Sequence, residues 1–192
     1  MKRIGMVIMC FILLLSAPMT VNAKSLQETI KYIQKAEKMT KSAYTQKKIR
    51  CKALPSNKAK TVGKIKINTD VKYRNYNKKW AITVYKGHLV FVARKYLKAA
   101  DYTPSYFRKM GVIGYNGWRW TWYSQRVLPG GGLRIPGRHV DELNMVCDRD
   151  NYICLASSDL SRGSVVDTPF GKKGKVYDNG CSSGILDIYC NF

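Results

Sequence analysis

The chain has 192 residues, of which 34 are Lys or Arg and 12 are Asp or Glu, so its formal net charge is +22. A balance this basic predicts attraction to a polyanion. The longest apolar run, Ile4 to Ala17, is shorter than the roughly 20 residues that span a bilayer, which argues against a transmembrane helix.

Residues 1–23 have the layout of a secretory signal peptide. Lys2 and Arg3 precede the apolar run, and small residues up to Ala23 end it. We therefore expect a secreted, soluble chain from about Lys24, with no transmembrane segment once the signal is removed.

The positive charge is concentrated in the N-terminal half. Residues 24–110 contain 23 basic and four acidic residues, whereas residues 111–192 contain nine and eight. This asymmetry predicts that the first half meets a polyanion. For an exported protein the available polyanions are wall polymers, anionic lipid surfaces and extracellular DNA. A basic surface kept for solubility explains the same charge.

Residues 24–47 are predicted to form a basic amphipathic helix that is clearest from Ser25 to about Thr45. Ser25 and Glu28 have capping-box spacing. Apolar residues recur at helical intervals, at Leu26, Ile30, Ile33 and Met39. Such a helix either spaces the protein from the cell, which we favour, or lies on a membrane surface.

Residues 48–98 are predicted to form a small barrel. Turn sequences such as Lys86-Gly87 separate five short strand-like runs. These runs are Ile49–Leu54, Thr61–Ile67, Val71–Tyr76, Trp80–Tyr85 and His88–Ala93.

The same region resembles the bacterial SH3-like domains of secreted wall proteins. The residues that fit the pattern are Arg50, Pro55, Ser56, Gly63, Trp80, Gly87, Phe91, Tyr96 and Leu97. The resemblance implies binding to peptidoglycan peptides or anionic wall polymers. Four aromatic residues are candidates for a peptide groove, although alternation places half of them in the core: Tyr73, Tyr76, Trp80 and Tyr85.

Residues 99–118 are predicted to be a linker. Three glycines and Pro104 interrupt it, and interleaved aromatic residues indicate that it packs on its neighbours. From Arg119 onward the strand pattern resumes, and no helical period is evident after Lys98. The remaining strands are expected at residues 120–124, 152–156, 164–167, 175–177 and 185–189, which suggests a compact all-β barrel over residues 119–192.

Two carboxylates flank a Gly/Ser/Cys turn near the C-terminus. Asp178 and Asp187 each follow a strand-like pair, Val176-Tyr177 and Ile185-Leu186. If the two strands pair, the acids lie near each other, and a carboxylate pair suits general acid/base work on a sugar bond. The alternative is a β-turn with two solvated acids.

The C-terminal region also resembles the 3D domain, a family of double-psi β-barrels found in membrane-bound lytic transglycosylase A and related to rare-lipoprotein-A-like proteins. The matching residues, in order, are Thr121, Tyr123, Gly163, Ser164, Asp178, Gly180, Gly184 and Asp187. The resemblance implies a six-stranded double-psi barrel in which Asp187 is the general acid/base and Asp178 orients or stabilises. Tyr123 is a candidate binding residue.

This chain departs from the family pattern at three points. The interval between Asp178 and Asp187 is shorter than usual, and Ser161 stands where the family has proline. The first family aspartate has its nearest counterpart in Asp159, one gap away. The transglycosylase also has a second domain that forms its glycan groove, for which this chain has no counterpart.

Five cysteines follow the signal peptide, as suits export. Four of them, Cys147, Cys154, Cys181 and Cys190, are disulfide candidates that allow three pairings. We favour Cys154 with Cys181 and Cys147 with Cys190, which leaves Cys51 over. No C-x-x-C occurs, and His139, on a basic loop, is the only nearby histidine, so we expect no metal site. No cofactor is expected either.

Together these features predict a secreted, cell-wall-associated protein that cleaves peptidoglycan glycan strands like a lytic transglycosylase. The alternative is a non-catalytic protein that binds peptidoglycan or wall polymers. A third hypothesis, a secreted polyanion binder acting on DNA or membranes, fits the charge but neither resemblance, and we expect no specific nucleic acid partner.

Overall fold

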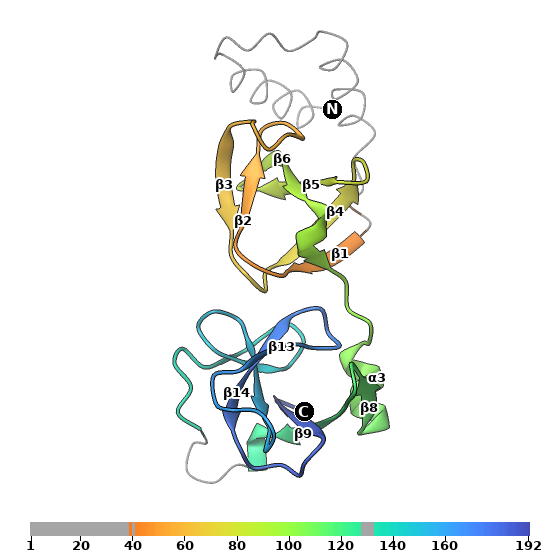
Figure 1. Ribbon diagram of the computed structural model, residues 1–192, viewed down its shortest axis with the longest axis vertical. Coiled ribbons are helices and arrows are strands. Elements are labelled where there is room, and N and C mark those ends of the chain that lie inside the picture. The colour runs from red at the N-terminus through yellow and green to blue at the C-terminus, as the bar shows by residue number, and fades with distance from the viewer. Residues whose placement is uncertain (1–38, 40, 128–132) are drawn as a thin grey trace, which may run out of the picture. The chain divides into compact units, whose positions relative to one another are not determined.

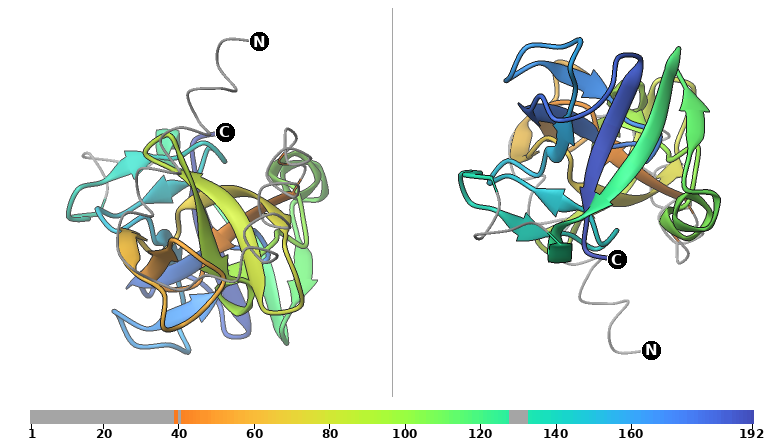
Figure 2. Two further views of the ribbon diagram at one scale, coloured as in Figure 1. Left: turned by 90° about the horizontal axis from the view of Figure 1, so that it is seen from above. Right: turned by 90° about the horizontal axis from the view of Figure 1, so that it is seen from below.

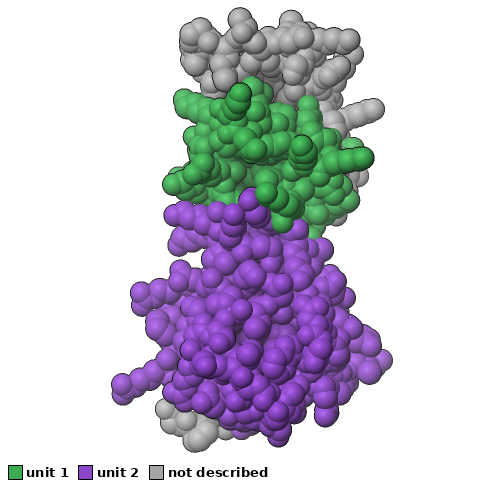
Figure 3. All heavy atoms as spheres, in the orientation of Figure 1, with its two compact units in different colours: residues 1–42, 49–65, 71–95 green, residues 43–48, 66–70, 96–192 purple. Residues whose placement is uncertain are grey.

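The computed structural model describes residues 39, 41–127 and 133–192. The predicted signal peptide and most of the predicted N-terminal helix lie outside these residues. The described chain is mostly β-strand, as predicted (Figure 1). It divides into two compact units, coloured separately in Figure 3. The first unit contains the described residues up to Ser42 together with Ile49–Ile65 and Val71–Lys95, and the second contains Ala43–Lys48, Lys66–Asp70 and Tyr96–Phe192.

The strands predicted for residues 48–98 are all present. They are β2 (Ile49–Lys52), β3 (Thr61–Ile65), β4 (Asp70–Asn75), β5 (Trp80–Tyr85) and β6 (His88–Ala93). Lys86 and Gly87 join β5 to β6 with φ angles of 50° and 80°, the left-handed geometry that suits a tight hairpin. Alternation along β5 and β6 buries Trp80, Ile82 and Phe91 together. The sheet runs in the order β3-β2-β6-β5-β4-β1-β7.

The end of the predicted N-terminal helix is instead a strand. Residues Lys41–Thr45 form β1, which pairs antiparallel with β7 (Leu97–Lys98) after the short 3₁₀ helix Arg94–Tyr96. Thr45 is fully buried, and its hydroxyl donates to the carbonyl of Lys66 at 2.5 Å. Pairing and burial with distant residues therefore override the helical spacing at this end.

The second unit contains an eight-stranded sheet. Six of its strands follow the order β10-β11-β12-β15-β9-β8, and the other two branch from it, because β14 pairs with β12 and β13 pairs with β14. Its strands are β8 (Ile113–Tyr115), β9 (Trp118–Ser124), β10 (His139–Val140), β11 (Val146–Cys147), β12 (Ile153–Ala156), β13 (Val165–Asp167), β14 (Lys173–Asp178) and β15 (Ile185–Cys190). A 3₁₀ helix, Gln125–Val127, follows β9. The five strands predicted after residue 118 are confirmed.

Strands β9 and β15 lie side by side and run parallel (Figure 2, right). One face of this pair buries Trp120, Leu186 and Ile188 in the main core of the second unit. The opposite face carries polar residues, including Thr121 and Asp187. Because side chains alternate along each strand, the core fixes which residues the other face presents.

The predicted linker, residues 99–118, contains regular structure. Helix α3 (Pro104–Met110) begins after Thr103, whose side chain accepts from the backbone N–H of Tyr106, and ends at Gly111 with a φ of 72°. Its seven residues bury only Phe107. A single buried position is too little for a helical period, so the helix escaped the sequence pattern although its cap residues are typical. In residues 39, 41–127 and 133–192, no helix combines the length and apolarity needed to cross a membrane.

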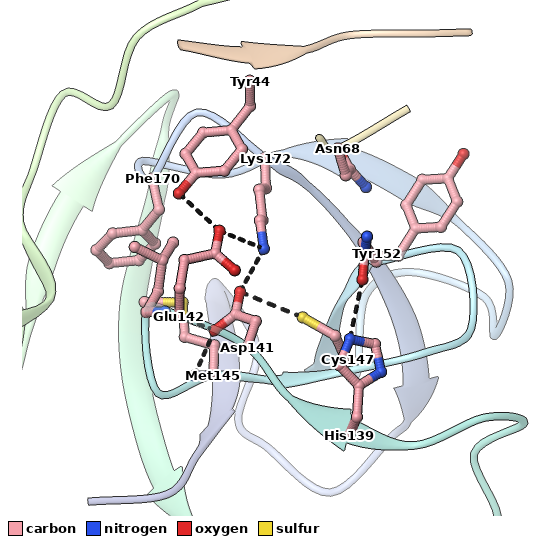
Figure 4. A network of polar contacts seen from close by, with 12 residues as sticks. Tyr44, Asn68, His139, Asp141, Glu142, Met145, Cys147, Tyr152, Phe170 and Lys172 are labelled. Carbon is pink, nitrogen blue, oxygen red and sulfur yellow. Dashed lines mark hydrogen bonds and ion pairs between the residues drawn. The ribbon is translucent and has the colours of Figure 1, made fainter. Parts of the chain in front are cut away.

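A buried polar network lies inside the second unit (Figure 4). The ammonium of Lys172 is 2.5 Å from Asp141 Oδ2 and 3.2 Å from Glu142 Oε1, and the side chains of Lys172 and Asp141 are only 1% and 2% exposed. Tyr44 of β1 donates to Glu142 Oε1 at 3.0 Å. Burial alone would lower the pKa of Lys172, but its two acidic partners raise it above its usual value.

Asp141 serves the backbone as well as Lys172. Its Oδ1 accepts the N–H groups of Leu143 and Met145, each at 2.9 Å, and Cys147 Sγ lies 3.5 Å from Oδ2. The carboxylate is therefore satisfied on both oxygens, as a buried charge must be. The network ties the turn around Lys172 to the loop before β11.

Candidate functional site

Asp187 lies in the middle of β15, directly beside Thr121 of β9 in the parallel register. The Thr121 hydroxyl donates to Asp187 Oδ1 at 2.8 Å. Burial raises the pKa of the half-buried carboxyl, although the hydrogen bonds from Thr121 and from the Ile188 backbone partly oppose this. A carboxyl that keeps its proton more tightly than an ordinary aspartate is suited to act as a general acid.

Asp178 ends β14 and lies two strands from Asp187. The predicted direct pairing of the two strands is wrong, because β12 runs between them and Ala156 is the register partner of both acids. At the usual strand spacing, the two Cα atoms are about 10 Å apart. The acids nevertheless share one face, since Tyr189 of β15 donates to Asp178 Oδ2 at 2.7 Å.

The face that holds these acids we call the aspartate face. It is formed by Arg119, Thr121, Tyr123, Ala156, Asp178, Asp187 and Tyr189. Within this face, the hydroxyl of Tyr189 is affected by both acids. Burial, the hydrogen bond to Asp178 and the charges of Asp178 and Asp187 all raise its pKa. This tyrosine therefore stays protonated and acts as a hydrogen-bond donor.

Asp178 is held tightly in place. Its Oδ1 accepts the backbone N–H of Asn179 at 2.8 Å, and Arg162 lies 3.9 Å away. Gly180 packs so close that a Cβ there would be 2.9 Å from Asp178 Oδ2. These contacts fit the orienting role expected for Asp178.

Asp159, the nearest counterpart of the first family aspartate, holds the turn before β15. It accepts the Gly184 backbone N–H at 2.6 Å and the Ser183 hydroxyl at 2.8 Å. These hydrogen bonds, led by that from Gly184, lower the pKa of its exposed carboxyl. Asp159 thus helps to set the start of the strand that carries Asp187.

The predicted aromatic binding residues lie in different settings. Tyr123 is on the aspartate face, 41% exposed, with its ring edge-on to Tyr189 at 6.4 Å between centroids. Trp80 is only 8% exposed and packs in the core of the first unit, so its ring is not offered to a ligand. Tyr85 packs against Gly63, where an added Cβ would overlap the tyrosine ring.

The described cysteines, Cys51, Cys147, Cys154, Cys181 and Cys190, are all unpaired. Neither predicted disulfide is therefore present among them. In the backbone, an antiparallel β-bridge places Met145, and not Cys147, opposite Cys190. Cys147 is then a diagonal neighbour of Cys190, typically 7–8 Å away, whereas a disulfide needs Cα atoms about 4.4–6.8 Å apart.

Sequence reasoning did not assign roles to Thr121 and Tyr189. Thr121 was noted only as part of a family pattern, and its bond to Asp187 depends on the pairing of β9 with β15. Tyr189 could have been found, because it lies two residues after Asp187 and thus on the same strand face. His139, predicted on a loop, instead begins β10; it is exposed, with its ring nitrogens 3.0 Å from Gly137 O and 2.9 Å from Asn151 Oδ1.

Within the part of the chain that the structure describes, no three His, Cys, Asp or Glu side chains are grouped so as to hold a metal ion. A scan against protein-family models and searches of curated proteins and of solved structures found no match to the chain.

Proposed function

We propose that the protein is a secreted, cell-wall-associated enzyme that cleaves peptidoglycan glycan strands in the manner of a lytic transglycosylase. Its second unit would be a 3D domain of the double-psi type, and its first unit an SH3-like wall-binding domain. The observation that carries the proposal is Asp187, a half-buried carboxyl with a raised pKa, on a face with exposed Tyr123.

In this mechanism one carboxyl makes both proton transfers. Protonated Asp187 donates to the glycosidic oxygen, and the bond from that oxygen to the sugar C1 breaks with positive charge developing on the ring. The C6 hydroxyl oxygen of the same sugar then attacks C1, and the Asp187 carboxylate takes the proton from that hydroxyl. The product is an anhydro ring, and Asp187 regains its proton.

The first unit supplies the wall attachment. Its described residues contain 13 Lys or Arg and no Asp or Glu. Arg50 and Lys64, both exposed, face each other across β2 and β3. Like charges directly opposite each other weaken a sheet, so an anionic wall polymer bound there would relieve the repulsion.

The same basic surface favours the second candidate function, which is wall binding without cleavage. The two are separated by incubating the protein with purified peptidoglycan and analysing the supernatant by mass spectrometry. Soluble fragments with anhydro ends support the enzyme. Co-sedimentation without released fragments supports the binding protein, and loss of all binding in moderate salt without any preference for glycan supports a general polyanion binder.

Gly180→Ala is expected to slow cleavage roughly 10- to 100-fold, because its Cβ forces the Asp178 carboxylate away from Tyr189. The free energy of unfolding should change by less than about 1 kcal/mol, since Gly180 is exposed and has no left-handed φ. Rates on peptidoglycan and thermal unfolding measure the two effects. Tyr189→Phe removes the same hydrogen bond without a clash, and unchanged rates in both variants would remove Asp178 from the mechanism.

A further inference from the structure

Arg119 is on the aspartate face but has no role in the mechanism above. It pairs with Ile185 in the same parallel register that pairs Thr121 with Asp187, so its side chain leaves the sheet on the side of Asp187. Two residues along a strand span about 6.6 Å. The guanidinium therefore reaches a group about one sugar ring away from the carboxyl of Asp187.

Arg119 is exposed, and in the described residues it makes no ion pair. Its backbone N–H donates to Gly184 O at 3.1 Å, which fixes the strand but leaves the guanidinium uncommitted. Asp159 also contacts Gly184, yet its two carboxylate oxygens already accept from the Gly184 N–H and the Ser183 hydroxyl.

The neighbouring strand leaves room beside Arg119. Its antiparallel partner on β8 is Gly114, and a Cβ at Gly114 would meet no heavy atom within 4 Å. The φ of Gly114 is outside the left-handed range, so its backbone accepts any residue. A glycine at this position therefore places no side chain against the guanidinium of Arg119 from across the two strands.

We propose that Arg119 forms a carboxylate subsite next to Asp187. Its occupant is a carboxylate carried on a sugar adjacent to the scissile bond of an N-acetylhexosamine glycan, such as the free lactyl group of N-acetylmuramic acid. Arginine presents two parallel N–H donors that match a carboxylate. This inference rests on the proposed function and adds to it a preference for glycan that has lost its stem peptides, because an attached peptide converts the lactyl carboxylate into an amide.

The test compares three soluble probes of equal backbone length with the full chain. The first is a tetrasaccharide of alternating N-acetylglucosamine and N-acetylmuramic acid with free lactyl carboxylates. The second is the same tetrasaccharide with stem peptides attached, and the third is chitotetraose, which has no carboxylate. Cleavage is followed as kcat/KM, and binding is measured by calorimetry in an Asp187→Asn background so that the probe is not cut.

Arg119→Gln should weaken binding and kcat/KM about 10- to 100-fold for the peptide-free probe and leave chitotetraose unchanged. Gly114→Glu should have a similar selective effect, because the new carboxylate pairs with Arg119 across β8 and β9. Gly114→Gln is the matched control, equal in size and uncharged, and should bind the peptide-free probe almost as tightly as the parent.

The inference is overturned if Arg119→Gln affects all three probes equally, if Gly114→Gln weakens binding as much as Gly114→Glu, or if the peptide-bearing probe binds more tightly than the peptide-free one. Failure of the proposed function looks different. In that case no probe is cut, but the ratio of the dissociation constants and its dependence on Arg119 still decide whether the subsite exists.

Discussion

Asp187→Asn is expected to reduce glycan cleavage by a factor of about 10² to 10⁴, the usual contribution of a general acid or base. Asparagine keeps the shape of the side chain and accepts the Thr121 hydrogen bond, but it has no proton to transfer. The measurement is the rate at which anhydro-ended fragments leave purified peptidoglycan. Asp101→Asn, at an exposed acid before α3, is the control and should cleave at the parent rate.

The same substitution should stabilise the fold at neutral pH. Because burial raises the pKa of Asp187 in the folded state, the charged carboxylate is better accommodated in the unfolded chain. The favourable contribution of the protonated form is complete below the unfolded pKa of about 3.9 and is lost as pH rises through the folded pKa. Urea unfolding should therefore give Asp187→Asn a larger free energy of unfolding than the parent at pH 7. The difference between the two proteins should be smaller at pH 3.5.

Two results would count against Asp187 as the acid. The first is an Asp187→Asn protein that yields the same fragments at the same rate as the parent. The second is a cleavage rate that increases as pH rises through the pKa of Asp187, since a general acid must hold its proton at the start of the reaction.

Lys172→Met is expected to lower the free energy of unfolding by about 3–5 kcal/mol, the usual effect of removing one partner of a buried ion pair. Methionine fills similar space but leaves Asp141, which is 2% exposed, without its ammonium. Asp141 cannot turn to solvent without giving up the N–H groups of Leu143 and Met145. Urea unfolding followed by intrinsic fluorescence measures the loss.

The adjacent lysine is a matched control. Lys173 pairs with Asp167 at 2.7 Å, but both side chains are partly exposed, so Lys173→Met should cost no more than about 1 kcal/mol. Adding Asp141→Asn to Lys172→Met should recover part of the loss, because the amide keeps an oxygen for the backbone and carries no charge. Equal stability of Lys172→Met and the parent would show that the network contributes nothing.

Much of the strand pattern was predictable because it depends on near neighbours. The alternation in residues 80–93 and the Lys86-Gly87 turn located β5 and β6 correctly at both ends. The pattern failed where distant residues decide the structure. Thr45 is buried in a strand by contacts with residues 66–69, although the preceding sequence has helical spacing.

The candidate site shows the same division. The strands that carry Asp178 and Asp187 were predicted from the chain alone, and the roles of the two acids stay a prediction. The insertion of β12 between them, the pairing of β9 with β15 and the hydrogen bond from Tyr189 to Asp178 were not. The cysteine pairing failed for the same reason, because a register that opposes Met145 to Cys190 cannot be read from the spacing of cysteines.

The sequence by itself determined the all-β class, the approximate positions of ten strands, the charge asymmetry and the two late acids, since period and composition are local properties of the chain. Only the tertiary structure decided which strands are neighbours, which face Asp187 occupies and which lysine is buried. Strand order joins residues tens of positions apart, and the free energy that selects it comes from burying whole faces together.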